Sequence, residues 1–301
     1  MNIKGIIKGI DEAVFPSNIY CMLCGAMIDA SRPYSLCDEC VKKMHLINEG
    51  VQEDGSVQRV CAKCGKALPP AYRGKLCYDC MSISHYFERG FSCLTYGLHE
   101  RKLMMDLKYN GRSSIATKMG EVMFDRMASK LITGVPDADG VIATMQDADG
   151  VIASDPERLV IDVVVPVPVS AERLRKRGYN QAAIMAKAFV WKWREARSAD
   201  GAFAKAPELR TGALRRTKNT QMLRGLNPSE RALAMKGAFE VTASGEKAIL
   251  GKTVLLIDDI YTTGATADAC SLALIEKGAK QVYVLTLASG GNRRPKEADS
   301  R

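Results

Sequence analysis

Two adjacent carboxylates followed by a hydroxyl-rich turn are the residues best suited to chemistry in this sequence. Residues 254–266 read Val-Leu-Leu-Ile-Asp-Asp-Ile-Tyr-Thr-Thr-Gly-Ala-Thr. This order predicts a buried strand, a turn and the start of a helix, and a helix N-terminus favours a bound phosphate. The turn comprises Thr262, Thr263, Gly264, Ala265 and Thr266.

Asp258 and Asp259 would repel a phosphate, but they suit the hydroxyls of a ribose or a metal bound to that ribose. Gly264 would let the backbone approach the phosphate closely. The segment therefore predicts a site for a ribose 5-phosphate group. The alternative is an ordinary strand–turn–helix in which both carboxylates are solvated.

Basic residues gather upstream of this motif. Four cations stand within five positions, and guanidinium forks suit a pyrophosphate. The alternative is a solvated basic helix start. The four residues are Arg173, Arg175, Lys176 and Arg177. The whole chain carries a formal net charge of +9, which admits nucleic acid, a phosphorylated small molecule or an anionic membrane surface as a partner.

Eight of the ten cysteines form a tandem repeat with a period of 40 residues. Each copy reads C-x2-C-x12-C-x2-C, and four thiolates are the ligands of a closed, structural zinc site. A glycine follows the second cysteine of each copy, at Gly25 and Gly65, where it relaxes the backbone around the sulfurs. The repeat predicts two zinc ions, held by Cys21, Cys24, Cys37, Cys40, Cys61, Cys64, Cys77 and Cys80.

The sequence favours pairing within each copy over a cross-braced arrangement, because the repeat is a clean tandem one. A disulfide framework is the alternative chemistry, and the absence of a signal-like start argues against it. Cys93 and Cys270 are predicted to be buried thiols. His45 and His99 are interpreted as surface or packing residues, and His85 as a support for the second zinc site.

Alternating strands and helices must position the carboxylates and the turn. The segment 160–169 and residues 253–257 and 281–287 are apolar enough for strands buried on both faces, which indicates a parallel α/β sheet. Helices are expected at 179–197, with Ile184, Met185, Ala188 and Trp191 inward, and at 265–277. With 301 residues and no apolar run long enough to span a bilayer, no transmembrane helix is predicted.

The chain divides into four parts. An amphipathic helix is expected over residues 1–15, a double zinc ribbon over 16–88 and the α/β domain over 89–288. Residues 137–143 and 147–153 repeat the same seven residues, so 137–158 is interpreted as a loop insertion. Residues 289–301 are expected to be a disordered tail.

The carboxylate motif resembles the fingerprint by which type I phosphoribosyltransferases bind phosphoribosyl pyrophosphate (PRPP). The segment from Val165 through Gln181, the residues 214–221 and the preceding zinc ribbons resemble the ComF family of competence proteins and their GntX-like relatives. The resemblance implies a type I phosphoribosyltransferase-like parallel sheet with flanking helices, preceded by a small double zinc-ribbon domain.

The resemblance also implies a role for each matched residue. Asp258 and Asp259 would be the catalytic carboxylates that bind the ribose hydroxyls, with Mg²⁺ bridging through the ligand. The turn at 262–266 would hold the 5-phosphate, and the loop carrying Arg173, Arg175, Lys176 and Arg177 the pyrophosphate. A second cluster, Arg215, Arg216 and Lys218, fits either a mobile loop over PRPP or a nucleic-acid contact.

Two functions remain open at this point. One is transfer of ribose 5-phosphate from PRPP to an unidentified acceptor, linked to DNA uptake in the bacterial cytoplasm. The other is a non-catalytic accessory protein that binds PRPP or single-stranded DNA and serves DNA-uptake proteins, with no stable membrane insertion. A purely structural zinc scaffold that docks on an uptake helicase or channel is a weaker interpretation.

Overall fold

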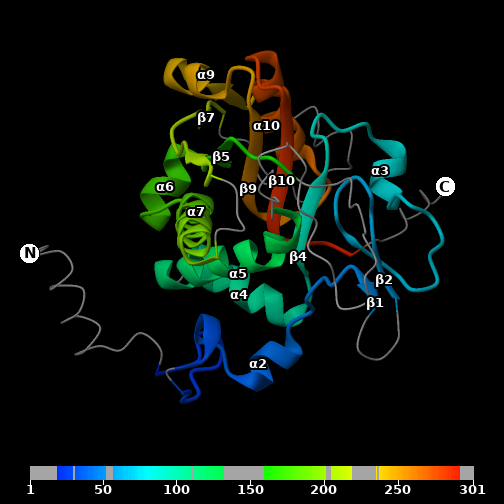
Figure 1. Ribbon diagram of the computed structural model, residues 1–301, viewed down its shortest axis with the longest axis vertical. Helices are drawn as coiled ribbons and strands as arrows, with labels where there is room; N and C mark the ends of the chain where they lie inside the picture. The colour runs from blue at the N-terminus through cyan, green and yellow to red at the C-terminus, as the bar shows by residue number, and fades with distance from the viewer. Residues whose placement is uncertain are drawn as a thin grey trace, which may run out of the picture.

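The computed structural model describes residues 19–29, 31–51, 57–109, 112–131, 159–200, 205–218, 235 and 237–291. The expected helix at 1–15, the insertion at 137–158 and the tail from 292 onward lie outside these residues. Figure 1 shows a central sheet flanked by helices, with the N-terminal segments lying along its lower and right-hand sides.

The central sheet has five parallel strands in the order β4-β10-β9-β5-β6. Strand β9 lies in the middle, paired on one side with β10 and on the other with β5. Its carboxylates are therefore near the centre of the sheet's carboxyl edge, where α/β sheets bind ligands. The strands are β4 (Gly90–Thr95), β5 (Val163–Pro166), β6 (Glu208–Leu209), β9 (Thr253–Tyr261) and β10 (Gln281–Ser289).

Helices cover both faces of the sheet, and successive strand residues point to opposite faces. Leu255 and Ile257 pack with α5 and α7 on one face, whereas Val254 and Leu256 pack with α10 on the other. The helices are α4 (Leu98–Tyr109), α5 (Ser113–Leu131), α6 (Ala171–Arg177), α7 (Gln181–Asp200), α9 (Ala243–Ile249) and α10 (Ala265–Glu276). An antiparallel pair, β7 (Leu214–Arg216) and β8 (Phe239–Val241), adds to the α10 side.

The N-terminal part is built from short pieces. Its described residues form a 3-10 turn, two short helices and a three-stranded antiparallel sheet in the order β1-β2-β3. We call residues 19–47 the first ribbon and residues 57–88 the second ribbon. The elements are η1 (Pro33–Ser35), α2 (Asp38–Lys43), β1 (Gly50–Val51), β2 (Val57–Val60), β3 (Ala67–Leu68) and α3 (Tyr78–Ser82).

The predicted fold class is confirmed: a parallel α/β sheet with flanking helices follows a small cysteine-rich part. Two boundaries differ from those expected. Strand β5 is shorter than 160–169, because Pro166 and Pro168 donate no backbone hydrogen bond. Strand β10 extends to Ser289, which pairs with Tyr261 and Thr95 and is fully buried, so Ser289 belongs to the sheet and not to the expected tail.

The inward face of α7 was also predicted wrongly at one position. Trp191 is 48% exposed, whereas Trp193 is 1% exposed. The buried stripe of this helix runs through Ala182, Ala186, Phe189 and Trp193, with the spacing of a helix face. Among the described residues, no helix combines the length and the apolar character needed to cross a membrane.

Candidate functional site

The turn between β9 and α10, residues 262–266, is called the phosphate loop below. Gly264 has a φ of +90°, a conformation that glycine adopts without strain. A Cβ at this position would lie 2.4 Å from the Tyr261 hydroxyl oxygen and 3.0 Å from His85 Cε1. The hydroxyl of Thr263 is buried and has no hydrogen-bond partner. Together with Asp258 and Thr286, the loop lines a cavity of about 60 Å³.

The two carboxylates at the end of β9 have different surroundings. Asp259 is buried; one of its oxygens lies 2.9 Å from Lys108 Nζ and accepts a 2.9 Å hydrogen bond from the Gln181 amide. Burial raises the pKa of Asp259, but Lys108 outweighs that effect and holds it below its usual value. Burial, together with the charge of Asp259, raises the pKa of Asp258 to about 7. At neutral pH Asp259 is therefore ionised, whereas Asp258 is in the middle of its titration.

Cations face these carboxylates across a cavity of about 180 Å³ that also reaches Thr262 and Thr266 of the phosphate loop. Burial, and then the charge of Arg173, lowers the pKa of Arg216. A negatively charged ligand in this cavity would relieve that repulsion among the cations. The basic residues that line the cavity are Lys108, Arg173, Arg177 and Arg216.

The predicted basic segment is divided by helix geometry. Arg173 and Arg177 stand four positions apart on α6, so they share the face that lines the cavity. Arg175 and Lys176 lie on other faces, are exposed and do not line it. Of the second cluster, Arg216 lines the cavity and Arg215 pairs with Glu240 at 2.9 Å.

Lys108 and Gln181 were assigned no role from the sequence. Gln181 ends the segment quoted for the family resemblance, and Lys108 lies in Asp106-Leu-Lys-Tyr, which also resembles that family, yet each meets Asp259 only through the fold. Lys108 comes from the C-terminal end of α4 and Gln181 from the first turn of α7. The resemblance of these segments to the family could have drawn attention to Lys108 and Gln181, but it does not indicate that both contact Asp259.

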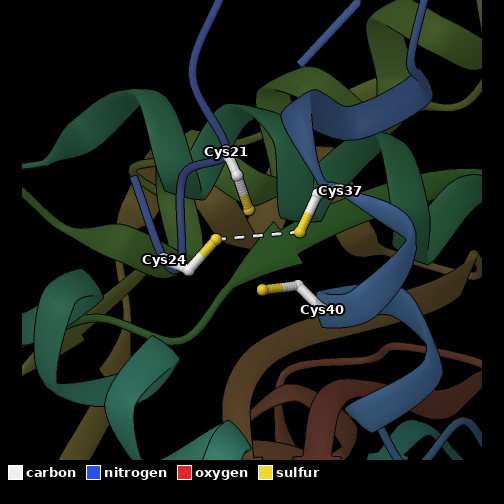
Figure 2. A group of neighbouring side chains, drawn as sticks. All are labelled: Cys21, Cys24, Cys37 and Cys40. Carbon is white, nitrogen blue, oxygen red and sulfur yellow. Dashed lines mark hydrogen bonds between the residues drawn. The ribbon is translucent and has the colours of Figure 1, made fainter. Parts of the chain in front are cut away.

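The eight repeat cysteines form two local tetrads, as the tandem repeat favoured. In each, the four sulfur atoms lie within 4.8 Å of one another. Figure 2 shows the sulfurs of the first tetrad pointing toward a common centre. All ten cysteines are free of disulfides, and Cys93 and Cys270 are buried as predicted. The first tetrad is Cys21, Cys24, Cys37 and Cys40, and the second is Cys61, Cys64, Cys77 and Cys80.

The surroundings of both tetrads suit a metal bound by thiolates. Burial raises the pKa of Cys21, but backbone N–H groups of Cys37 and Cys24 outweigh it and lower the pKa to about 6, whereas burial and the neighbouring thiols raise the pKa of Cys40, so one thiol of the tetrad ionises first. Beside the second tetrad, the ammonium of Lys66 is buried, and its Nζ lies 2.6 Å from an Asp79 oxygen. A buried cation offsets the net negative charge of a tetrathiolate zinc centre. Both tetrads therefore fit structural zinc.

The two tetrads should differ in how fast they lose zinc. Cys24 is exposed, whereas all four cysteines of the second tetrad are buried. We expect two zinc ions per chain by elemental analysis and two phases of release to a chelator in excess. Cys24→Ser should remove the fast phase and leave the slow one. A single phase containing both ions would contradict this assignment.

Comparison with known proteins gives a consistent result. The family model described as "Double zinc ribbon domain" matches residues 10–81. "Competence protein F" of Haemophilus influenzae is 30% identical over 42% of this chain and 50% of its own length. "Competence protein ComFC" of Bacillus subtilis is 31% identical over 42% of this chain and 43% of its own. "DNA utilization protein YhgH" of Escherichia coli O6:H1 is 23% identical over 76% of this chain and 83% of its own.

The chain is therefore similar to competence proteins of the ComF type, and its residues 10–81 match the double zinc ribbon. The alignment spans about half the length of the two competence proteins and most of the length of the DNA utilization protein. The match to the double zinc ribbon over residues 10–81 puts that domain before the parallel α/β sheet.

Proposed function

We propose that this chain binds PRPP, with Mg²⁺, at the carboxyl end of β9 and transfers its ribose 5-phosphate to an acceptor. The observation that supports the proposal best is a juxtaposition. The phosphate loop, with its buried and unpartnered Thr263 hydroxyl, lies beside the two carboxylates. The cavity next to it is lined by four basic residues, which we call the cationic wall: Lys108, Arg173, Arg177 and Arg216. A ligand with a phosphate, a diol and a pyrophosphate satisfies all three groups at once.

Each group then has a defined task. The backbone amides and hydroxyls of the phosphate loop hold the 5-phosphate at the N-terminus of α10. Asp258 and Asp259 accept hydrogen bonds from the ribose hydroxyls, while Lys108 and Gln181 fix the orientation of Asp259. Arg173 and Arg177 bind the pyrophosphate. When bound, Mg²⁺ supplies positive charge to the departing pyrophosphate.

In this proposal the protein accelerates transfer by orientation and by preorganised charge, with no covalent step on a side chain. The cationic wall stabilises negative charge as it develops on the leaving group. Asp258, with a pKa raised to about 7, is ionised above neutral pH, so the site is best suited to the ligand in that range. The names of the relatives, a competence protein and a DNA utilization protein, support a role in the use of imported DNA.

Exchanging both carboxylates tests the site. We expect the double variant Asp258→Asn, Asp259→Asn to weaken PRPP binding with Mg²⁺ at least 100-fold in isothermal titration calorimetry. Two charge-assisted hydrogen bonds, each worth about 1.5–3 kcal/mol, are lost. Glu276→Gln, at the far end of α10, is the matched control and should bind as the wild type does. Equal affinity in the double variant would refute the site.

A second candidate function, binding of single-stranded DNA, is supported by a separate surface. A groove of about 1,040 Å³ lies between the first ribbon and the outer faces of α5 and α7. Tyr20 and Trp191, the aromatic residues of its described lining, are 60% and 48% exposed. Such rings stack on bases, and nearby cations contact the backbone phosphates. The basic lining residues are Arg112, Lys118 and Lys187.

Removing one ring tests this surface. We expect Trp191→Ala to weaken binding of a labelled single-stranded oligonucleotide about tenfold, since stacking on one aromatic contributes about 1–3 kcal/mol per base. Leu250→Ala, at an exposed apolar site away from the groove, is the control. Fluorescence anisotropy at several salt concentrations is the measurement. Unchanged affinity in Trp191→Ala would exclude this groove, and PRPP binding should be unaffected in either variant.

A further inference from the structure

The two ribbons belong to different hydrophobic cores. Cys21 and Leu36 of the first ribbon pack in the core that contains α5 and α7. Cys61 and Phe87 of the second ribbon pack in the core on the opposite face of the sheet, with Tyr261 and residues of α10. The second ribbon thus shares its packing with the phosphate loop, and the first ribbon does not.

Each ribbon contacts the α/β domain through a histidine that lies against a carboxylate of that domain. His45 and His85 stand one 40-residue period apart, each five positions after the last cysteine of its copy. Nδ1 of His45 lies 3.2 Å from an oxygen of Glu100, in the first turn of α4. Nδ1 of His85 lies 2.7 Å from an oxygen of Asp268, in the first turn of α10. The repeat therefore extends to the histidines, but the two helices that receive them have different roles.

A backbone amide strengthens each docking contact. The N–H of His45 donates to Glu100 at 2.8 Å, and the N–H of Tyr86 donates to Asp268 at 3.1 Å. The His85 ring is fully buried and stacks on Phe87, with ring centroids 4.8 Å apart. Its position is therefore fixed by packing as well as by hydrogen bonds.

His85 also reaches the metal site and the phosphate loop. Its Nε2 lies 3.2 Å from the sulfur of Cys80, a member of the second tetrad, and 3.5 Å from the Tyr261 hydroxyl. The space above Gly264 is occupied by this ring and by Tyr261. One buried imidazole thus contacts a zinc ligand, the first turn of α10 and the residue that ends β9.

We infer that His85 is a positioning residue that makes the phosphate loop dependent on metal in the second tetrad. With metal bound, the Cys80 sulfur has a fixed position, and its contact with Nε2 fixes the orientation of the His85 ring. Nδ1 of the same ring then fixes Asp268 and, with it, the first turn of α10. Without metal, the Cys80 sulfur can move, the His85 ring is no longer fixed, and the phosphate loop loses its defined conformation. The ligand named in the test rests on the proposed function, whereas the coupling between the tetrad and the loop does not.

The experiment compares His85→Ala with His45→Ala in the full chain purified with zinc. Backbone hydrogen exchange over residues 262–268 is the first readout, and PRPP affinity with Mg²⁺ is the second. We expect His85→Ala to exchange at least tenfold faster over these residues and to bind at least tenfold more weakly. His45→Ala should match the wild type at the loop. Zinc content should stay at two per chain in His45→Ala.

Two further variants keep the test decisive if His85→Ala fails to fold. Asp268→Asn, at a residue whose side chain is 15% exposed, should loosen the loop while both zinc ions stay bound. His85→Asn, whose amide stands near the place of Nδ1, should restore part of the loop's protection. Slow removal of the second zinc from the wild type should raise exchange over residues 262–268, whereas removal of the first zinc should not.

Equal exchange at the loop in His85→Ala, Asp268→Asn and His45→Ala would overturn the inference. The two proposals fail separately. If the wild type does not bind PRPP but the exchange rates differ as expected, the proposed function is wrong and the coupling stands. If the wild type binds PRPP and all variants bind it equally with equal exchange, the coupling is wrong and the function stands.

Discussion

Replacing Lys108 with methionine is expected to destabilise the folded protein by about 3 kcal/mol, the usual cost of leaving one member of a buried ion pair alone. Asp259 is buried beside Asp258, and Lys108 is the cation 2.9 Å from it. Without that cation, the two adjacent carboxylates repel each other at one site, and Asp259 keeps its hydrogen bond from the Gln181 amide. The pair should then hold a proton more tightly, and PRPP affinity should fall with it.

Urea unfolding of Lys108→Met against Arg101→Met measures this effect. Arg101 is an exposed residue of the same helix, so its replacement should change the free energy of unfolding by less than about 0.5 kcal/mol. Adding Asp259→Asn to Lys108→Met should recover part of the lost stability, because the unpaired charge is then removed. If both single variants unfold at the same urea concentration, Lys108 is not the partner on which Asp259 depends.

Gly264→Ala is expected to have the second large effect, and it should act on ligand binding more than any other single exchange in the phosphate loop. The added Cβ would lie 2.4 Å from the Tyr261 hydroxyl oxygen, so either the ring or the loop must move. A left-handed backbone adds about 1 kcal/mol of strain. We expect at least a 100-fold loss of PRPP affinity together with reduced stability.

Gly251→Ala separates strain from contact. Gly251 has a φ of +68° and no atom within 4 Å of the place of a Cβ, so its replacement shares the backbone strain and lacks the clash. It should lower stability by about 1 kcal/mol and leave PRPP affinity unchanged. Equal losses of PRPP affinity in the two alanine variants would show that backbone strain alone causes the loss. The contact between residue 264 and Tyr261 would then have no part in ligand binding.

The sequence predicted the parts of the molecule that depend on local order. The cysteine spacing places four sulfurs around one centre without any information from the rest of the chain, and the tetrads formed within each copy. The strand–turn–helix at 254–266 likewise follows from a buried apolar run and a glycine. Both patterns are complete within a short segment, and so they can be read from the sequence.

Contacts between distant segments could not be predicted in this way. Lys108 and Asp259 are brought together by the packing of α4 into the core that contains α5 and α7, and no periodicity links their positions. His85 was interpreted as a support for the zinc site, but its contact with Asp268 depends on how the second ribbon docks on α10. Trp191 was placed on the wrong face of α7 because the long apolar run 188–191 leaves the centre of the buried stripe undefined.

The most direct test of the account is a crystal structure of the chain with PRPP and Mg²⁺ at pH 8, where Asp258, with a pKa of about 7, is ionised. We predict the 5-phosphate on the backbone amides of the phosphate loop and the ribose hydroxyls against Asp258 and Asp259. The pyrophosphate should face Arg173 and Arg177. PRPP bound elsewhere, or a loop that stays empty at saturating PRPP, would contradict the assignment of this site.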